Sequence, residues 1–171
     1  PHGPSGRIFA RRQVMSKSIT LRPARRRDAR AIAGILHRWI AATEWFETQR
    51  PASASVAAMR GLIDTGQVWV AVQQGFWPKI IGVIALQGDE IAALYVDAHA
   101  QGQGIGAALL AQAQAASSWP LRLATFQANA QARAFYARMG FVELASTVGD
   151  NEEGLPDIRL LAPWPDESPA L

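Results

Sequence analysis

The clearest chemical signal in the sequence is a glycine-rich stretch that follows an apolar segment, Leu94–Val96. It reads Gln101-Gly102-Gln103-Gly104-Ile105-Gly106-Ala107 and leads into an alanine- and leucine-rich segment of helical character. Glycine lets a ligand approach the main chain closely, and the first N–H groups of a helix have no partner within it. Because the helix dipole also favours negative charge there, the stretch predicts a main-chain site for a phosphate or pyrophosphate group.

The same glycines fit a second pattern, the dinucleotide-binding motif G-x-G-x-x-A, through Gly102, Gly104 and Ala107. That motif expects an acidic residue about 20 residues later to bind the ribose. The matching region, 126–129, has no acidic residue, and only 65 residues follow Gly106. The dinucleotide interpretation is therefore the weaker of the two.

Two motifs at a suitable separation point to a known family. Gln101-x-x-Gly104-x-Gly106 resembles the acyl-CoA-binding motif of the GCN5-related N-acetyltransferase (GNAT) family, and Asn129–Phe141 is similar to its N-x-x-A-x-x-F-Y-x-x-x-G-F segment. The segment Ile19–Ala24 resembles the first strand of the family, and Leu94–Val96 its fourth. The resemblance covers roughly residues 18–162 and implies an enzyme that moves an acetyl group from acetyl-CoA to a primary amine.

The resemblance implies that acetyl-CoA is held mainly by main chain. The N–H groups of the glycine-rich turn would bind the pyrophosphate, and the pantetheine arm would lie beside Leu94–Val96 like an added strand. The N–H of Val96 or a neighbour would polarise the thioester carbonyl. Asn129 also suits the N-cap of a helix. The expected donor-site residues are Leu94, Tyr95, Val96, Gln101, Gly102, Gln103, Gly104, Ile105, Gly106, Ala107, Asn129 and Phe135.

Tyr136 is the candidate general acid. A phenol with a pKa near 10 is protonated at neutral pH and can supply the proton that the departing CoA thiolate needs. Phe135 and Met139 are expected to face the core, with Tyr136 offset from them toward the cleft. The residues alone favour an ordinary core or surface aromatic, and it is the resemblance that favours catalysis.

The general base is less clearly marked. We take Glu44, at the end of the first helix, as the catalytic candidate; Asp97, Glu90 and Glu153 are alternatives, and Asp97 is also suited to steadying the turn. The acceptor site is expected to include Trp45, Phe46, Glu47 and Glu152, whereas Trp39 lies on an apolar stripe and is assigned to the core. Acidic groups near the cleft would suit an ammonium-bearing small molecule or peptide.

The chain contains no cysteine. This excludes disulfides and a cysteine-linked acyl intermediate, so direct transfer is expected, and it is compatible with a reducing cytoplasmic compartment. His37 and His99 stand alone, and no metal site is expected. A non-catalytic acyl-CoA-binding or regulatory module on the same fold is the alternative function. A homodimer is possible.

Charge is concentrated at one end of the chain. Residues 1–27 carry eight of the 17 basic residues and no acid, so the remainder holds nine basic and 14 acidic residues. This argues against the nucleic-acid partner that a basic protein otherwise suggests, and no apolar run is long enough to span a membrane. Residues 1–16 are expected to be a disordered or non-native extension, 17–164 the acetyltransferase domain and 165–171 a tail.

The elements that must position these groups follow from hydrophobic periodicity and turn residues. Strands are expected at 19–22, 68–72, 80–86, 91–96, 121–126, 141–146 and 158–161, and helices at 28–40, 53–65, 106–117 and 130–139. Asp28 and either Ser53 or Ser55 are expected N-caps. The prediction is a single α/β domain of mixed α+β type. Its sheet has about seven mostly antiparallel strands, helices on both faces, and, as the resemblance implies, a splay between strands four and five.

Overall fold

The computed structural model describes residues 18–48 and 51–163. Within them seven strands form one mixed sheet in the order β1-β2-β3-β4-β5-β7-β6. All neighbouring pairs are antiparallel except β4 and β5. The strands are β1 (Ile19–Pro23), β2 (Gln67–Gln73), β3 (Lys79–Gln87), β4 (Glu90–Val96), β5 (Arg122–Phe126), β6 (Val142–Ser146) and β7 (Asp157–Leu161). The predicted fold class and element order are confirmed.

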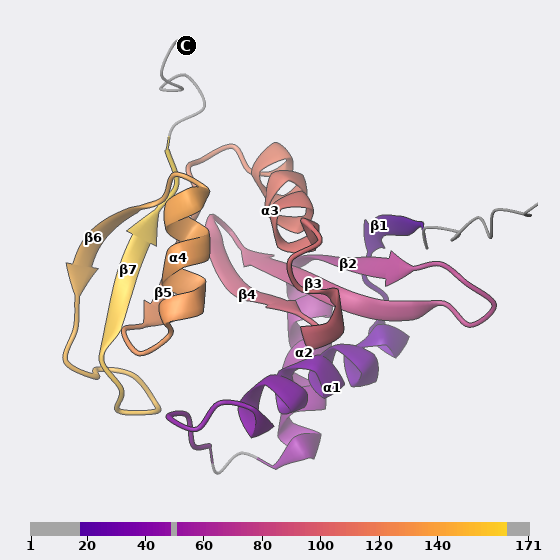
Figure 1. The fold of residues 1–171 in the computed structure, drawn as a ribbon, viewed down its shortest axis with the longest axis horizontal. Coiled ribbons are helices and arrows are strands. Elements are labelled where there is room, and N and C mark those ends of the chain that lie inside the picture. The colour runs from indigo at the N-terminus through magenta and orange to yellow at the C-terminus, as the bar shows by residue number, and fades with distance from the viewer. Residues whose placement is uncertain (1–17, 49–50, 164–171) are drawn as a thin grey trace, which may run out of the picture.

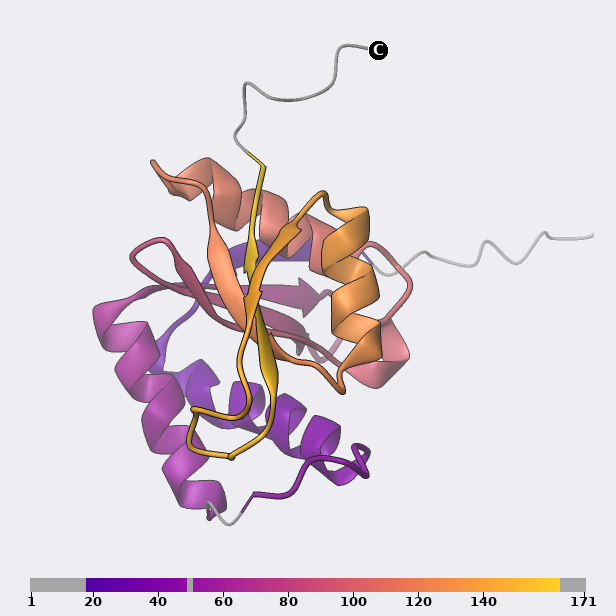
Figure 2. The same ribbon diagram turned by 90° about the vertical axis from the view of Figure 1, so that its left-hand side faces the viewer.

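Helices cover both faces of the sheet (Figures 1 and 2). The helices are α1 (Ala29–Ala41), α2 (Ala52–Thr65), α3 (Ile105–Ala116) and α4 (Ala130–Arg138), with short 3-10 turns η1 (Arg26–Asp28) and η2 (Ala98–Ala100). Successive strand residues point to opposite faces, so Val70 and Val72 pack with α1 and α2, whereas Ala71 packs with α3. Two apolar cores result, one on each side of the sheet.

The parallel strands β4 and β5 touch at one end only. Their single pairing joins Glu90 to Arg122, and the N–H of Arg122 donates to the carbonyl of Asp89 at 2.9 Å. Beyond that point the strands diverge. A bulge in β4 adds one residue, Ala92, between the partners of Ala85 and Leu86, and a bulge bends and twists a strand. The splay predicted between strands four and five is therefore present.

Two of the predicted helix caps are wrong. Asp28 directly precedes α1, but its buried carboxylate accepts from the guanidinium of Arg22 at 2.7 and 3.1 Å and from the N–H of Arg25 at 2.8 Å. Ser53 and Ser55 lie inside α2, which begins after Pro51. The reason is local competition: a short acidic side chain binds whichever donor the tertiary fold brings closest. Asn129 does cap α4, accepting from the N–H of Ala132 at 3.1 Å.

Candidate active site

The glycine-rich turn places free main-chain donors at the start of α3. Gly102 and Gly104 have φ values of 73° and 78°, a region that glycine enters without strain. The first helical hydrogen bond runs from Ala108 to Gly104 at 3.0 Å. Across the described ranges, the N–H groups from Gly102 to Ala107 donate to no protein acceptor. With the dipole of α3 behind them, these donors form a pocket of positive potential suited to a phosphate.

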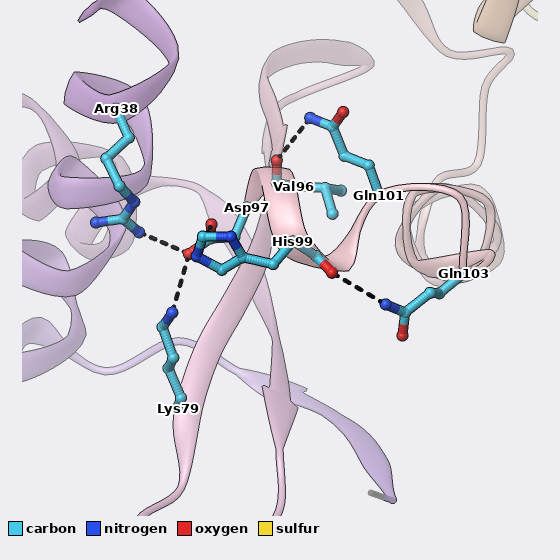
Figure 3. A network of polar contacts seen from close by, with 7 residues as sticks. All are labelled: Arg38, Lys79, Val96, Asp97, His99, Gln101 and Gln103. Carbon is cyan, nitrogen blue, oxygen red and sulfur yellow. Dashed lines mark hydrogen bonds and ion pairs between the residues drawn. The ribbon is translucent and has the colours of Figure 1, made fainter. Parts of the chain in front are cut away.

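Side-chain amides hold the turn in shape without using those donors (Figure 3). The Nε2 of Gln101 donates to the carbonyl of Val96 at 3.1 Å, and the Nε2 of Gln103 donates to that of His99 at 3.1 Å. From α4, Gln131 donates to Oε1 of Gln101 at 2.9 Å. The side chains of Gln101 and Gln103 therefore link the turn to β4, η2 and α4 through hydrogen bonds. The N–H groups that stay free for a phosphate belong to the main chain.

Asp97 ties the end of β4 to α1 and β3 (Figure 3). Its carboxylate is 1% exposed, and its Oδ2 lies 2.8 Å from Nη2 of Arg38 and 3.3 Å from Nζ of Lys79. Nε2 of His99 lies 3.4 Å from Oδ1, the one buried side-chain polar atom in the described part of the chain that lacks a hydrogen bond. Asp97 therefore steadies the turn, as its position at the end of the strand suggests.

The electrostatics of Asp97 follow from these contacts. Burial raises the pKa of its carboxyl, but hydrogen bonds and charge from Arg38 and Lys79 outweigh burial and hold the pKa below its ordinary value. The group is therefore an anion at neutral pH, committed to structural partners rather than to proton transfer.

The end of β4 presents main chain to the gap beside it. The N–H of Asp97 donates to the carbonyl of Ile81 at 2.8 Å. Because inward and outward hydrogen bonding alternates along an antiparallel strand, the N–H of Val96 must point away from β3 toward the splay. The carbonyl of Val96 is occupied by Gln101, so its N–H is the group at this position that is open to a ligand.

One cavity lies between β4, α3 and α4. Its volume is about 370 Å³, and it is lined by the main chain of the glycine-rich turn, by Val96 and by Phe135. A Cβ on Gly106 would come within 3.2 Å of the Phe135 ring, so this glycine serves the close packing of α3 against α4. Residues 94–96, 101, 102, 104–107, 129 and 135 of the predicted donor site line this cavity; Gln103 does not, and it supports the turn from outside.

The second cavity, about 440 Å³, lies on the side of the sheet covered by α1 and α2. Aromatic rings form one wall: Phe46 lies 5.2 Å from Trp39 and 5.4 Å from Phe126 between ring centroids. Trp45 packs behind them, 5.9 Å from Trp39, and is absent from the lining. Trp39, assigned to the core from its helical spacing, lines both cavities instead. The apolar face of α1 that carries Trp39 lies over the gap between β4 and β5, because β5 does not pair with β4 at that end.

The two cavities meet in the splay at six shared residues, Trp39, Leu94, Tyr95, Asn129, Ala132 and Tyr136. Tyr136 is 6% exposed, and its hydroxyl makes no hydrogen bond within the described ranges. Burial, with a smaller contribution from Tyr95, raises the pKa of its phenol well above 10.0. Tyr136 is thus a protonated hydroxyl at the junction. It also packs into the core on the α3 side, so the expected separation between core-facing Phe135 and cleft-facing Tyr136 is only partial.

Carboxylates are distributed unevenly around the second cavity. Glu44 is exposed and lines none of the three cavities, so the structure does not bring the candidate base to the cleft. Glu47 and Glu152 line a third, outer pocket that adjoins the second cavity through Phe46 and Glu153. Glu153 lines both, and Asp157 lines the second cavity. The fold therefore favours the loop between β6 and β7 over the end of α1 as the source of acidic groups.

Sequence reasoning did not identify Arg138 and Gln131 as donor-cavity residues. A signal for Arg138 existed, because it lies three residues after Phe135 and shares its helical face. Asp157 and Thr125 of the second cavity carried no comparable signal, since β5 and β7 are short strands whose pairing decides what they face. No group of three or more metal-ligating side chains occurs in residues 18–48 and 51–163, and no helix of that part is long and apolar enough to cross a membrane.

Comparison with known proteins bears on this geometry. Residues 64–143 match the family model of the acetyltransferase (GNAT) domain. The chain is 29% identical over 146 residues to the peptidyl-lysine N-acetyltransferase YjaB of Salmonella typhimurium, which covers 85% of this chain and 99% of that protein.

Solved structures show the same fold. The solution structure of apo YjaB from Escherichia coli matches with a TM-score of 0.69 and 24% identity, over 85% of this chain and 97% of that one. The structure of YncA from Salmonella typhimurium, a putative acetyltransferase with its cofactor acetyl-CoA, matches with a TM-score of 0.65 and 20% identity, over 89% and 96%. Together with the glycine-rich turn and the splayed strands, the match over residues 64–143 identifies a GNAT domain in this chain, and the relatives named as acetyltransferases support an N-acetyltransferase.

Proposed function

We propose that this enzyme moves the acetyl group of acetyl-CoA directly to the side-chain amine of a lysine in a peptide or protein. The observation that carries the proposal is the meeting of a main-chain-lined cavity and an aromatic cavity at Tyr136, in the gap between β4 and β5. Two substrates entering from opposite sides would bring their reacting groups together there. Direct transfer accords with the absence of cysteine, and the lysine acceptor follows the name of the YjaB relatives.

The residues of the first cavity fit acetyl-CoA, which supplies an acetyl group activated as a thioester. The unpaired N–H groups from Gly102 to Ala107 would hold its pyrophosphate, and Arg138 adds a cation to the same cavity. The main chain of Leu94 and Val96, which faces the splay, would hydrogen-bond the extended arm as a neighbouring strand does. The N–H of Val96 would stabilise the negative oxygen that develops as the carbonyl is attacked.

Tyr136 and the solvent supply and accept the protons that move during acetyl transfer. The acceptor enters as an ammonium and must lose one proton to become nucleophilic. Its nitrogen then bonds to the acetyl carbon, and the carbon–sulfur bond breaks. Tyr136 would give its proton to the departing sulfur and recover one from the nitrogen, so that the products are the amide, the CoA thiol and one released proton. The raised pKa of the Tyr136 phenol keeps it protonated until that step.

The second cavity would hold the acceptor. Its aromatic wall can enclose the methylene chain of a lysine side chain, and aromatic faces attract cations over short distances. Apolar walls also disfavour the ammonium form, which eases its loss of a proton. We retain two further predictions for this protein, a cytoplasmic location and a homodimer, which cell fractionation and light scattering would test.

The test is acetyl transfer itself. Purified protein, acetyl-CoA and a panel of lysine-containing peptides should release CoA thiol and yield peptides heavier by one acetyl group, measured by thiol titration and mass spectrometry. A peptide with arginine in place of lysine and a blocked N-terminus is the matched control. Saturable CoA binding without transfer to any amine would favour the non-catalytic acyl-CoA-binding module, and transfer to free small amines alone would exclude the peptide acceptor.

A further inference from the structure

We propose that Glu153 forms the ion pair that admits the acceptor's ammonium group to the second cavity and selects for a positively charged amine. This inference rests on the proposed function, whose acceptor is protonated at neutral pH. It assigns the acidic contact with the acceptor to Glu153 instead of Glu44, which lines none of these cavities, or Glu152, which lines only the outer pocket.

Glu153 lies where the outer pocket opens into the second cavity. It lines both spaces, together with Ile40, Phe46 and Thr48. Its charge reaches into the cavity: burial raises the pKa of the Tyr95 phenol, and the Glu153 carboxylate raises it further. Tyr95 in turn adjoins Tyr136 at the junction with the first cavity. An amine that pairs with Glu153 is therefore at the entrance of the second cavity, which leads to the gap between β4 and β5.

Glu153 is the carboxylate of this cavity that is open to an outside partner. The other one, Asp157, accepts the Thr147 hydroxyl on Oδ1 at 2.6 Å and the Asn151 amide on Oδ2 at 3.2 Å. Glu153 has no hydrogen bond or ion pair with any described residue. Further in, the hydroxyl of Tyr136, a residue that is 6% exposed, also makes no hydrogen bond with any described residue, so the cavity offers a polar group at each end.

The loop that carries Glu153 is fixed by Asn151. Its amide donates to the carbonyl of Leu155 at 2.7 Å and accepts from the N–H of Leu155 at 3.2 Å, while the N–H of Gly154 donates to the Asn151 carbonyl at 3.1 Å. Gly154, at φ 64°, completes the turn. Because the main chain on both sides of Glu153 is held, its carboxylate is presented at the cavity mouth at a lower cost in conformational entropy than on a free loop.

The test is a binding measurement that needs no turnover. Nα-acetyl-lysine amide is titrated into the protein with saturating CoA, and the tryptophan fluorescence of the cavity wall is followed. The neutral comparison ligand is Nα-acetyl-6-hydroxynorleucine amide, which has a hydroxyl in place of the ammonium. Glu153→Gln should weaken binding of the lysine amide about threefold to fivefold, the upper range of an exposed ion pair, and leave the hydroxyl ligand within twofold. Glu153→Lys should weaken the lysine amide further.

Asp150→Asn is the matched control, because it removes one negative charge from the same loop at an exposed residue that lines none of the three cavities. It should leave both dissociation constants within twofold. Three results would each overturn the role of Glu153. Glu153→Gln and Asp150→Asn could weaken binding of the lysine amide equally, or Glu153→Gln could weaken binding of the hydroxyl ligand as much as that of the lysine amide. The third result is that the unaltered protein does not bind the lysine amide. Failure of acetyl transfer to lysine peptides, with charge-selective binding intact, would overturn only the proposed function.

Discussion

The two cavities that meet at Tyr136 are built by different means. The first cavity, which we propose as the donor cavity, is lined mainly by two segments, the stretch from the end of β4 to the start of α3 and the facing residues of α4. The second cavity, which we propose as the acceptor cavity, is lined by residues from α1, α2, β4, β5, α4 and the loop between β6 and β7. A site made of one local turn is set by short-range rules, whereas a site made of distant side chains depends on how every element packs.

Substitution at the junction should have the largest effect, because Tyr136 belongs to both cavities. Tyr136→Phe keeps the ring in its packed position and removes the hydroxyl, so kcat should fall at least about 100-fold, the usual lower range for loss of a general acid. The acetyl-CoA dissociation constant, measured by calorimetry, should stay within about threefold. An unchanged kcat would remove Tyr136 from the mechanism.

The dependence of the reaction rate on pH is a second test of Tyr136. Because burial raises the phenol pKa well above 10.0, Tyr136 should remain protonated through the alkaline range in which an ordinary tyrosine ionises. The rate of the unaltered enzyme should therefore show no fall attributable to Tyr136 between pH 8 and about pH 10.

Asp97 joins the two regions, since it binds Arg38 of α1 and ends the strand that leads to the donor turn. Asp97→Asn should lower the free energy of unfolding by about 1–3 kcal/mol, because two cations lose an anionic partner in a buried position. Chemical denaturation at neutral pH would measure it.

The sign of the pH dependence follows from the lowered pKa of Asp97. Its contribution to stability is complete above the ordinary carboxyl value of 3.8 and is lost as the pH falls below that value through the folded-state pKa. The stability difference between the unaltered protein and Asp97→Asn should therefore narrow in acid. A difference that is constant down to pH 2 would contradict the assigned ion pairs.

Gly104→Ala should affect the donor cavity selectively. A Cβ at φ 78° costs about 1 kcal/mol, and relief of that strain would tilt the N–H groups that face the phosphate. The acetyl-CoA dissociation constant should rise about fivefold to tenfold with binding of the lysine ligand unchanged. Gly61→Ala, in α2 with open space at its Cβ, is the control and should change neither constant.

Phe46→Leu should give the smallest effect, on the acceptor side alone. Leucine keeps an apolar wall but removes the aromatic face, a loss of about 0.5–1 kcal/mol toward a cation at an open site. The acceptor KM should rise about twofold to fivefold while the acetyl-CoA KM stays constant. A larger change in the acetyl-CoA KM than in the acceptor KM would show that the two cavities are not functionally separate.

Most of the donor cavity was predictable from the sequence. Glycines at 102, 104 and 106, an apolar strand before them and a helix after them specify a turn whose donors are main-chain groups, whatever the rest of the fold does. The cap at Asn129 followed in the same way from its place before α4. The close packing of Gly106 against Phe135 was not predictable in this way, because that contact joins segments 29 residues apart.

The acceptor cavity was predictable only in outline. Phe46 and Glu47 do reach its walls or mouth, but Glu44 does not, although it stands only two residues before Phe46. The chain leaves α1 at Ala41 and follows an irregular path, so side-chain direction no longer follows a fixed period. Trp39 was misplaced for a related reason: a helical stripe faces a core only where the sheet beneath it is closed.

The sequence by itself therefore indicated the family, the glycine-rich turn with its free main-chain donors, the tyrosine candidate and, through the absence of cysteine, direct transfer as the expected route. Each depends on residue type and on contacts a few positions apart. The tertiary structure alone decided that β4 and β5 pair at one end only, that Trp39 faces the resulting gap, and that Glu153 is the glutamate where the outer pocket opens into the second cavity. These depend on the packing of segments that are distant in the sequence, from Glu90 and Arg122, 32 residues apart, to Phe46 and Glu153, 107 residues apart, which no local pattern of residues encodes.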